Sequence, residues 1–484
     1  MDCHCFGNTG SQKQARINTT LRFRRDPSLF LFTSELAAPG PQQREYSELL
    51  SKFDPDLHRI YLRAEYDIII IGAGAAGLMA GKVFAEANKN FIMLEGRDRI
   101  GGRIHSIHHN GRILEAGAEF IHGDLPLTNN LLKRSGIEFV RVSGKMYHSF
   151  QGDWSGGDDF GSGWGLLMKR MNELKKDLPL REFLDKYFPE DKYASLRRSV
   201  RGFAEGFDLA DITEASTKAL YKEWSHEQDH QYRIPAGYGA LMEWIAASIE
   251  AAGISILINQ CVNRVVWEKD LVRVITTESR EFSSKRLLIT IPIPLLQNQT
   301  LPAAVHFDPP ITNQIRMAEK IGFGKLVKLI YLFREDFWEG SHKNLGFVIS
   351  DQSIPTWWTQ LPMKTGILTG WWGNPPAEKT VSDEAIGSQG IKSLSGIFTN
   401  QSGEIQSLLE AQFIFNWQKE VFSQGAYSYP KPGSIQAIRD LRQPVEQCLF
   451  FAGEALFEGE SIGTVEAALS SGRDMALNIL KSLA

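Results

Sequence analysis

The chain contains 484 residues, of which 43% are hydrophobic and 23% are charged. These proportions are typical of a folded globular protein and exclude a largely disordered chain, while the length predicts more than one domain. Because 57 acidic residues balance 53 lysines and arginines, we expect no nucleic-acid partner. The longest apolar stretch, 287–305, is interrupted by three prolines, so no membrane-spanning helix is expected.

Residues 1–60 differ in composition from the rest of the chain. They are rich in polar residues, and basic residues outnumber acidic ones in their first half, which predicts a disordered or targeting tail. The 4 cysteines, two of them in this tail, are too few for a disulfide framework and indicate a reducing compartment. We therefore expect a cytoplasmic protein, with organelle targeting by the tail as the alternative.

The first predicted element is a strand at 66–71, an apolar and β-branched run of the kind found in parallel strands buried on both faces. It leads into G-A-G-A-A-G at 72–77, which opens a helix of small residues, and a second strand follows at 91–95. The glycines allow a tight turn and a close approach of a pyrophosphate to the helix N-terminus, and Glu95 can accept a hydrogen bond from a ribose hydroxyl. This unit predicts dinucleotide binding.

The later predicted elements alternate between helices and strands. In chain order they are a helix over 166–193, a helix over 238–252, strands within 262–291, strands within 336–372, a buried strand at 448–452 and a helix over 464–483. No internal repeat is evident in the sequence.

Three further motifs resemble those of a known family. G-R-D-R-I-G-G-R at 96–103, after the glycine-rich turn and Glu95, resembles the FAD-binding signature of the flavin amine oxidases. G-A-E-F-I-H-G at 117–123 is similar to the flavin-edge segment of polyamine oxidases. F-F-A-G-E at 450–454, with G-T-V-E at 463–466, resembles the family's C-terminal FAD motif, where a helix dipole stabilises charge on the reduced flavin.

The resemblance implies an α/β fold with a Rossmann-like FAD-binding domain and a second, mixed α+β substrate domain. It implies that 61–145, 232–300 and 430–484 form the FAD-binding domain, and that 146–231 and 301–429 form the substrate domain. The residues that it implies for FAD binding are Gly72, Gly74, Ala76, Gly77, Glu95, Arg97, Gly101, Gly102, Arg103, Gly117, Ala118, Glu119, Val262, Gly453, Glu454, Thr464 and Val465. The FAD should be non-covalent, because Ala426 stands where monoamine oxidases carry the linking cysteine.

Catalytic residues are also implied by the resemblance. Lys328, in G-F-G-K-L-V-K, matches the lysine that holds a water at flavin N5, with Lys325 as the alternative. Tyr427 supplies an aromatic wall beside the amine, but Thr464 replaces the opposing tyrosine, so a complete aromatic cage is not expected. His122 can hydrogen-bond the substrate chain. Further residues expected along the path of the amine are Phe120 and either Trp371 or Trp372.

The implied reaction is oxidation of a primary or secondary amine, polyamines included, to an imine, with O2 reduced to hydrogen peroxide. Related FAD enzymes that act on amino acids or on desaturation substrates share these motifs, as does a non-catalytic FAD-binding protein. A histone-lysine demethylase is not expected, because no insert or chromatin-binding module is evident. The sequence does not indicate the oligomeric state.

One motif suggests another class of enzyme, a zinc hydrolase. H-E-Q-D-H at 226–230 matches H-E-x-x-H, in which two histidines on one helical face bind zinc and the glutamate activates water. However, Pro235 follows closely and the stretch lacks an apolar face that would anchor such a helix. We therefore expect a polar turn and no metal site at His226, Glu227 and His230.

Overall fold

The computed structural model describes residues 65–157, 163–226, 230–375, 381–399, 402–459 and 461–483, all of which belong to the unit Arg63–Ala484. The tail predicted over 1–60 lies outside these ranges. No helix within them is long and apolar enough to span a bilayer.

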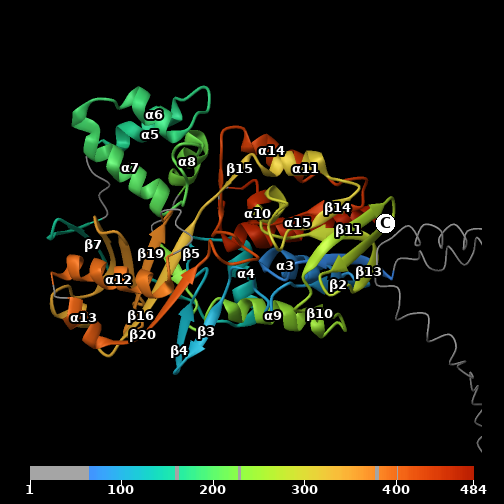
Figure 1. The fold of residues 1–484 in the computed structure, drawn as a ribbon, viewed down its shortest axis with the longest axis horizontal. Coiled ribbons are helices and arrows are strands. Elements are labelled where there is room, and N and C mark those ends of the chain that lie inside the picture. The colour runs from blue at the N-terminus through green and yellow to red at the C-terminus, as the bar shows by residue number, and fades with distance from the viewer. Residues whose placement is uncertain are drawn as a thin grey trace, which may run out of the picture. The chain divides into compact units, whose positions relative to one another are not determined.

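The described chain begins with a parallel βαβ unit (Figure 1). β1 (Tyr66–Ile71) leads into α3 (Ala75–Glu86), and β2 (Phe91–Leu94) returns parallel to β1 with Leu94 opposite Ile71. The three isoleucines that precede Ile71 are fully buried. Both faces of β1 are thus covered, which explains its uninterrupted apolar sequence.

Eight strands of the described chain form the sheet around β1. Their order is β10 (Ile256–Leu257), β2, β1, β13 (Glu281–Ile289), β12 (Leu271–Thr276), β11 (Val262–Glu268) and β14 (His306–Asp308), with β22 (Leu449–Phe451) paired to the end of β13. β13 runs parallel to β1 and β22 and antiparallel to β12. Strands from three distant parts of the chain thus share one sheet. β14 belongs to the same sheet although it follows residue 300, where the predicted FAD-binding segment ends. The domain division remains a prediction.

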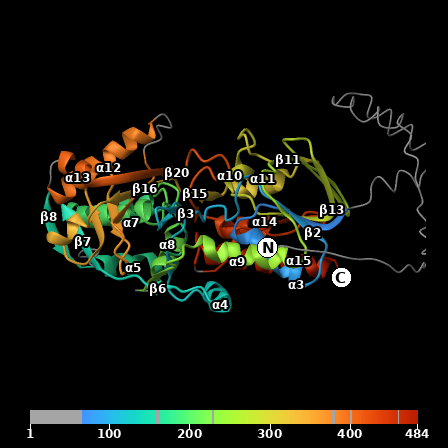
Figure 2. The ribbon, with the colours of Figure 1, turned by 90° about the horizontal axis from the view of Figure 1, so that it is seen from below.

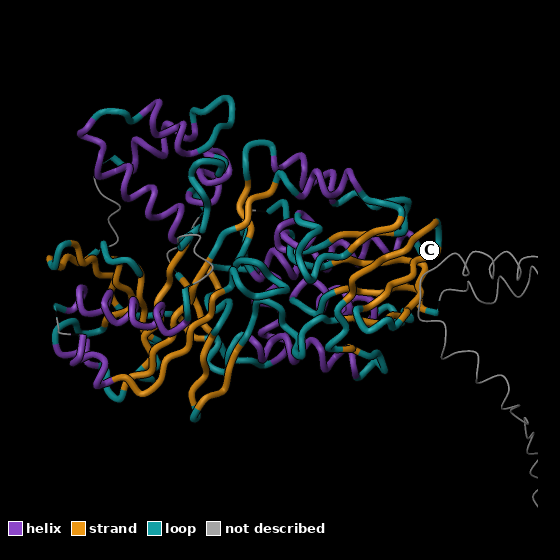
Figure 3. Tube along the Cα trace, in the orientation of Figure 1, coloured by secondary structure: helices purple, strands orange, loops and turns teal. Residues whose placement is uncertain are grey.

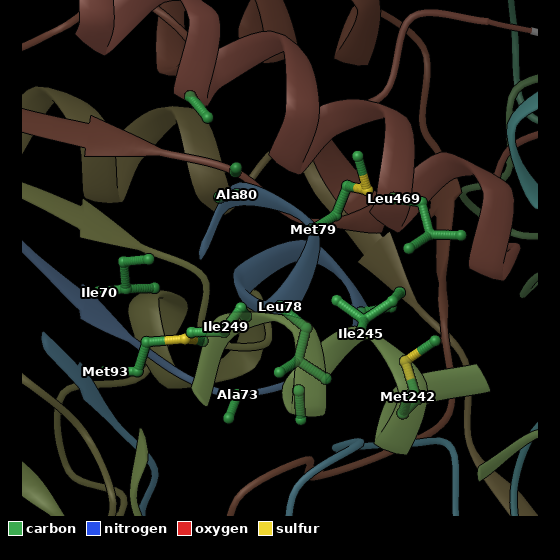
Figure 4. Close-up of a cluster of buried hydrophobic side chains, with 14 of the residues drawn as sticks. Ile70, Ala73, Leu78, Met79, Ala80, Met93, Met242, Ile245, Ile249 and Leu469 are labelled. Atoms are coloured by element: carbon green, nitrogen blue, oxygen red, sulfur yellow. The ribbon is translucent and has the colours of Figure 1, made fainter. Parts of the chain in front are cut away.

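Helices cover both faces of this sheet. On one face lie α3, α9 (Gly239–Glu250) and α15 (Val465–Ser482), whose side chains form a common core with β1 and β2 (Figures 2 and 4). α15 packs closely on α3, because a side-chain carbon at Gly472 would lie 2.1 Å from the Ala76 carbonyl oxygen. The other face packs on α10 (Pro294–Gln297), α11 (Thr312–Ala318) and α14 (Ser434–Leu441).

A second group of strands lies apart from the first (Figure 3). Within the described chain the order of this seven-stranded sheet is β20 (Leu409–Asn416), β16 (Leu326–Phe333), β19 (Ile367–Gly373), β18 (Thr356–Thr359), β17 (Leu345–Ser350), β7 (Lys145–Phe150) and β8 (Asp153–Gly156). β16 is buried along its whole length. α12 (Asp383–Phe398) and α13 (Ser402–Leu408) pack on this sheet.

The helix predicted over 166–193 is three shorter helices. Pro179 precedes the first residue of the second helix, and Pro189 follows its last turn; proline lacks the N–H that a continuous helix would need. The helices of this region are α5 (Trp164–Asn172), α6 (Leu180–Tyr187), the 3-10 helix η2 (Asp191–Tyr193), α7 (Ala194–Gly206) and α8 (Thr217–Trp224).

Shorter elements complete the described chain. They are the pair β3 (Ser106–His109) and β4 (Arg112–Glu115), the three-stranded sheet β5 (Ile121–His122), β9 (Gln231–Arg233) and β6 (Val140–Arg141), the pair β15 (Ile321–Phe323) and β21 (Ser428–Pro430), the helix α4 (Pro126–Ser135), and the 3-10 helices η3 (Phe337–Gly340) and η4 (Glu454–Leu456).

Candidate active site

The turn between β1 and α3 is packed too closely for side chains at two positions. Gly72 has a φ of +101°, and a side-chain carbon there would lie 2.6 Å from Thr290 Oγ1. A side-chain carbon at Gly77 would lie 1.9 Å from the Gly72 carbonyl oxygen. Only glycine fits at these positions, so α3 begins directly against the turn. The free N–H groups and the dipole of its N-terminus favour an anion there.

Glu95 holds the end of this turn. Its Oε2 accepts a hydrogen bond of 2.7 Å from the Ala73 N–H, and its Oε1 accepts one of 3.0 Å from the Arg97 N–H. The Arg97 guanidinium is held in turn by Glu420 at 2.7 Å and by Ser423 at 2.8 Å. A carboxylate has about four acceptor positions, so Glu95 keeps capacity for a hydroxyl group.

The C-terminal motif places a helix N-terminus at the same site. Thr464 caps α15, and its hydroxyl accepts a hydrogen bond of 3.2 Å from the Ala467 N–H. Glu466, in the first turn, accepts a hydrogen bond of 2.7 Å from the Thr128 N–H. Because α15 has 18 residues, its dipole is fully developed at Val465.

One cavity of about 2240 Å³ connects these features. It exceeds the usual volume of a small-molecule pocket and offers room for a dinucleotide together with a substrate. Every residue predicted to bind FAD lines the cavity except Gly77, and the predicted catalytic residues Lys328, Tyr427 and His122 line it as well. Gly77 lies outside the lining, but its lack of a side chain lets α3 pack against the Gly72 carbonyl oxygen.

Lys328 lies on β16 with none of its surface exposed. Its Nζ donates to the Gly117 carbonyl oxygen at 3.0 Å and to Glu119 Oε2 at 2.8 Å. The alternative, Lys325, is exposed and does not line the cavity. Of these two lysines, the structure therefore favours Lys328.

A family model described as flavin-containing amine oxidoreductase matches residues 75–480. The chain belongs to this family. Polyamine oxidase 2 of Arabidopsis thaliana is 26% identical over 454 residues, 86% of this chain and 89% of that protein. Lysine-specific histone demethylase 2 of Homo sapiens is 24% identical, over 80% of this chain and 50% of that protein. A structure of putrescine oxidase bound to putrescine has a TM-score of 0.72 and 18% identity, covering 86% of this chain and 99% of that one.

These comparisons confirm the predicted family, the amine oxidase fold and FAD as the cofactor. The glycine cradle, the carboxylate of Glu95 and the two helix N-termini suit the phosphates, ribose and ring of FAD. The side chain of Ala426 on the cavity wall has no group that could bond to the flavin, which agrees with the non-covalent FAD typical of polyamine oxidases.

Aromatic rings line the part of the cavity beyond the FAD motifs in this amine oxidoreductase. Tyr427 stacks on Trp371 with ring centroids 6.5 Å apart, and Trp371 contacts Trp358 at 5.8 Å. Phe120 packs on Trp358 at 5.5 Å. Of the two tryptophans expected along the path, Trp371 lines the cavity, whereas Trp372 packs against the core of the second sheet.

His122 is held among these rings in its neutral form. Its ring contacts Phe207 edge-on at 5.8 Å. Burial lowers the pKa of His122 to about 4, because the imidazolium would lose its hydration. At neutral pH His122 is therefore a neutral hydrogen-bonding group.

Acid is expected to destabilise the protein through His122. The unfolded imidazole titrates near pH 6.5 and the folded one near pH 4, so the unfolded state takes up the proton first, and stability falls as the pH falls. The loss between pH 7 and pH 5 is about 2 kcal/mol. In urea unfolding at these two pH values, the free energy of unfolding of His122→Gln should fall by that much less than that of the wild type. The free energy of unfolding of His108→Gln, a variant at an exposed histidine, should fall as much as that of the wild type. Equal losses in all three proteins would contradict a neutral imidazole at position 122.

Neither histidine of the zinc motif lies on a helix, which such a site requires. α8 ends at Trp224, before His226, and β9 begins at Gln231, directly after His230. Glu227 lies outside the described residues. His226 Nδ1 is 2.7 Å from the Lys222 carbonyl oxygen. Among the residues that the structure describes, no group of three or more His, Cys, Asp and Glu side chains could hold a metal ion.

Several residues of the site were not predicted. Four of them line the cavity, namely Phe207, Asp208, Glu223 and Trp358, and two others, Arg233 and Gln360, contact Glu119. Only Trp358 had a local signal, its place in a Trp-rich segment, because the others resemble ordinary surface residues in the sequence.

Proposed function

We propose that this amine oxidoreductase oxidises a small aliphatic amine that carries a second ammonium group, with O2 as the electron acceptor. The amine loses two electrons and two protons to become an imine, water hydrolyses the imine, and O2 takes up the electrons and protons as hydrogen peroxide. FAD, when bound, supplies the redox chemistry by accepting a hydride equivalent from the carbon next to the nitrogen. The names polyamine oxidase 2 and putrescine oxidase, borne by two similar proteins, support this substrate class.

The charge around Tyr427 is the observation that carries the proposal. Asp208 and Glu223 line the cavity together with Tyr427. Burial raises the pKa of Tyr427 well above its ordinary value, and the charges of Asp208, Glu223 and Glu454 raise it further. A negative potential at an aromatic wall attracts an ammonium group, both through the carboxylates and through the ring faces.

Asp208 is well placed to act on a ligand at this wall. It is 6% exposed, and its Oδ2 accepts a hydrogen bond of 2.8 Å from Trp224 Nε1, which fixes the carboxylate. Arg198 and Lys222 also line the cavity. The charges that act on Tyr427 are nevertheless those of carboxylates, so the second ammonium group is expected near Tyr427.

The other residues of the site have separate roles in binding FAD, orienting the amine and holding water. The turn at Gly72 and the α3 N-terminus would hold the FAD pyrophosphate, Glu95 a ribose hydroxyl, and the α15 N-terminus the flavin ring. Tyr427 and Trp371 orient the amine and exclude water. An ammonium group has three N–H donors, and Lys328 uses two on Gly117 and Glu119. The third is available to hold a water on the cavity wall.

A pair of amines of equal length tests the substrate class. We expect 1,4-diaminobutane to bleach the oxidised flavin band anaerobically, with a KM at least about tenfold lower than that of n-butylamine, because only the diamine reaches a buried carboxylate. Asp208→Asn should raise the KM for the diamine about tenfold and leave that for n-butylamine within about twofold.

Other outcomes would contradict the proposal. Bleaching by amino acids alone would indicate the related amino-acid oxidases, and bleaching by a methylated lysine peptide alone would indicate a demethylase. Equal KM changes for both amines in Asp208→Asn would show that this carboxylate acts on the structure of the wall and not on a second ammonium group.

A further inference from the structure

Three buried charged side chains are linked by ion pairs through one carboxylate. We call Glu119, Lys328 and Arg233 the buried triad. Lys328 Nζ lies 2.8 Å from Glu119 Oε2, and Arg233 Nη1 lies 3.3 Å from Glu119 Oε1. No side chain of the triad is more than 3% exposed. Glu119 precedes β5, Arg233 lies on β9 and Lys328 on β16, so the triad joins two sheets.

Four groups of the protein surround the Glu119 carboxylate. Besides the two cations it accepts hydrogen bonds of 3.0 Å from Trp358 Nε1 and 3.0 Å from Gln360 Nε2. Trp358, Gln360 and Arg233 lie at Oε1, whereas Lys328 is at Oε2. Glu119, which the sequence resemblance placed among the FAD-binding residues, makes its shortest contact with Lys328.

The two cations of the triad differ in one property. A guanidinium does not lose its proton in proteins, whereas a buried lysine does so readily when its counter-ion is removed. A buried ammonium without a counter-ion is costly. If the Glu119 charge were removed, Lys328 is thus the group that would become neutral, and Arg233 would favour that change by repulsion.

We propose that Glu119 is a positioning residue that keeps Lys328 in its ammonium form at the cavity wall, and that Arg233 opposes it by competing for the same carboxylate. This inference rests on the proposed function, in which Lys328 holds a water on the cavity wall. It adds that the charge on Lys328 is set by the balance between Glu119 and Arg233.

Two further features act on the triad. Glu115, on β4, interacts electrostatically with Lys328 and Arg233; burial raises the pKa of Glu115 to about 7, so it gains a negative charge above that pH. The Trp358 ring lies 5.4 Å from Lys328 Nζ and favours the cation. Burial alone would raise the pKa of Glu119, but Lys328 and Arg233 reverse this and hold it below its ordinary value.

Variants of opposite sign test the proposal in the FAD-loaded protein. Glu119→Gln should move the pH profile of flavin reoxidation by O2 to lower pH by at least about one unit, because Lys328 then loses its counter-ion. Arg233→Met should move the profile to higher pH, because Glu119 then forms its ion pair with Lys328 alone. The double variant, whose triad charge matches that of the wild type, should lie between them.

Acetylation of Lys328 by acetic anhydride, measured by peptide mass spectrometry, provides a readout that does not depend on activity. Only a neutral amine reacts, so the rate at pH 8 should rise at least about tenfold in Glu119→Gln and should not rise in Arg233→Met. Lys82 is the internal reference, since it is a buried lysine paired with Glu86 at 2.9 Å outside the cavity. Its acetylation should be equal in all variants.

Shifts of the same sign in both variants would overturn the proposal, as would an unchanged profile and acetylation rate in Glu119→Gln. If Glu119→Gln does not fold, the test rests on Arg233→Met, in which the charges of Glu119 and Lys328 balance. In that case a pH profile of Arg233→Met that does not move to higher pH would overturn the proposal. If Lys328→Met reoxidises at the wild-type rate, the proposed role of Lys328 fails and this inference with it. If Lys328→Met is slow but the pH profiles of Glu119→Gln and Arg233→Met do not move, this inference fails and the proposed function stands.

Discussion

Replacing Lys328 by methionine is expected to slow flavin reoxidation by O2 at least about 100-fold, while anaerobic reduction by the amine changes by less than about threefold. Reduction of O2 builds up negative charge, and a fully buried ammonium stabilises such charge far better than one in water. The fold should persist, because methionine has a similar shape and Glu119 keeps its ion pair with Arg233.

Stopped-flow absorbance separates the two half-reactions of this variant. The control is Lys82→Met, which makes the same substitution at a buried lysine outside the cavity and should leave both rates unchanged. Equal slowing of both half-reactions in Lys328→Met would indicate a distorted cavity. Unchanged reoxidation would remove Lys328 from the reaction with O2.

The second large effect is expected at a residue that does not line the cavity. Gly77→Ala would place a side-chain carbon 1.9 Å from the Gly72 carbonyl oxygen, so the first turn of α3 must move away from the turn that precedes it. We expect a stability loss of about 1–3 kcal/mol from this overpacking and at least tenfold weaker FAD binding, about 1.4 kcal/mol. Thermal unfolding and the flavin-to-protein absorbance ratio measure the two effects.

Gly81→Ala is the matched control on the same helix. A side-chain carbon there would lie 2.9 Å from Ile249 Cδ1 and from Met93 Sδ, which belong to flexible side chains, and 3.4 Å from Phe91 Cε2, an ordinary contact distance. These atoms can shift, and alanine favours a helix more than glycine does. FAD retention should therefore equal that of the wild type, and equal loss in both variants would argue against a specific role for the contact at Gly77.

The FAD motifs were predictable because their determinants are local. A buried strand, a glycine-rich turn, a helix of small residues and a strand ending in Glu95 follow one another directly, and the structure contains them as β1, α3 and β2. The helix over 464–483 was predicted for the same reason. The helix over 166–193 was predicted too long, because Pro179 and Pro189 interrupt a continuous apolar pattern.

By itself, then, the sequence determined the family, the cofactor and the turns that hold it, since these depend on residues close together in the chain. Tertiary structure decided between neighbours: adjacent residues of a strand face opposite sides, so only the packing of the sheet places Trp371 at the cavity and Trp372 in the core. It likewise distinguished the buried Lys328 from the exposed Lys325. The partners of Glu119 lie up to 241 residues away, and no local pattern encodes a contact over that distance.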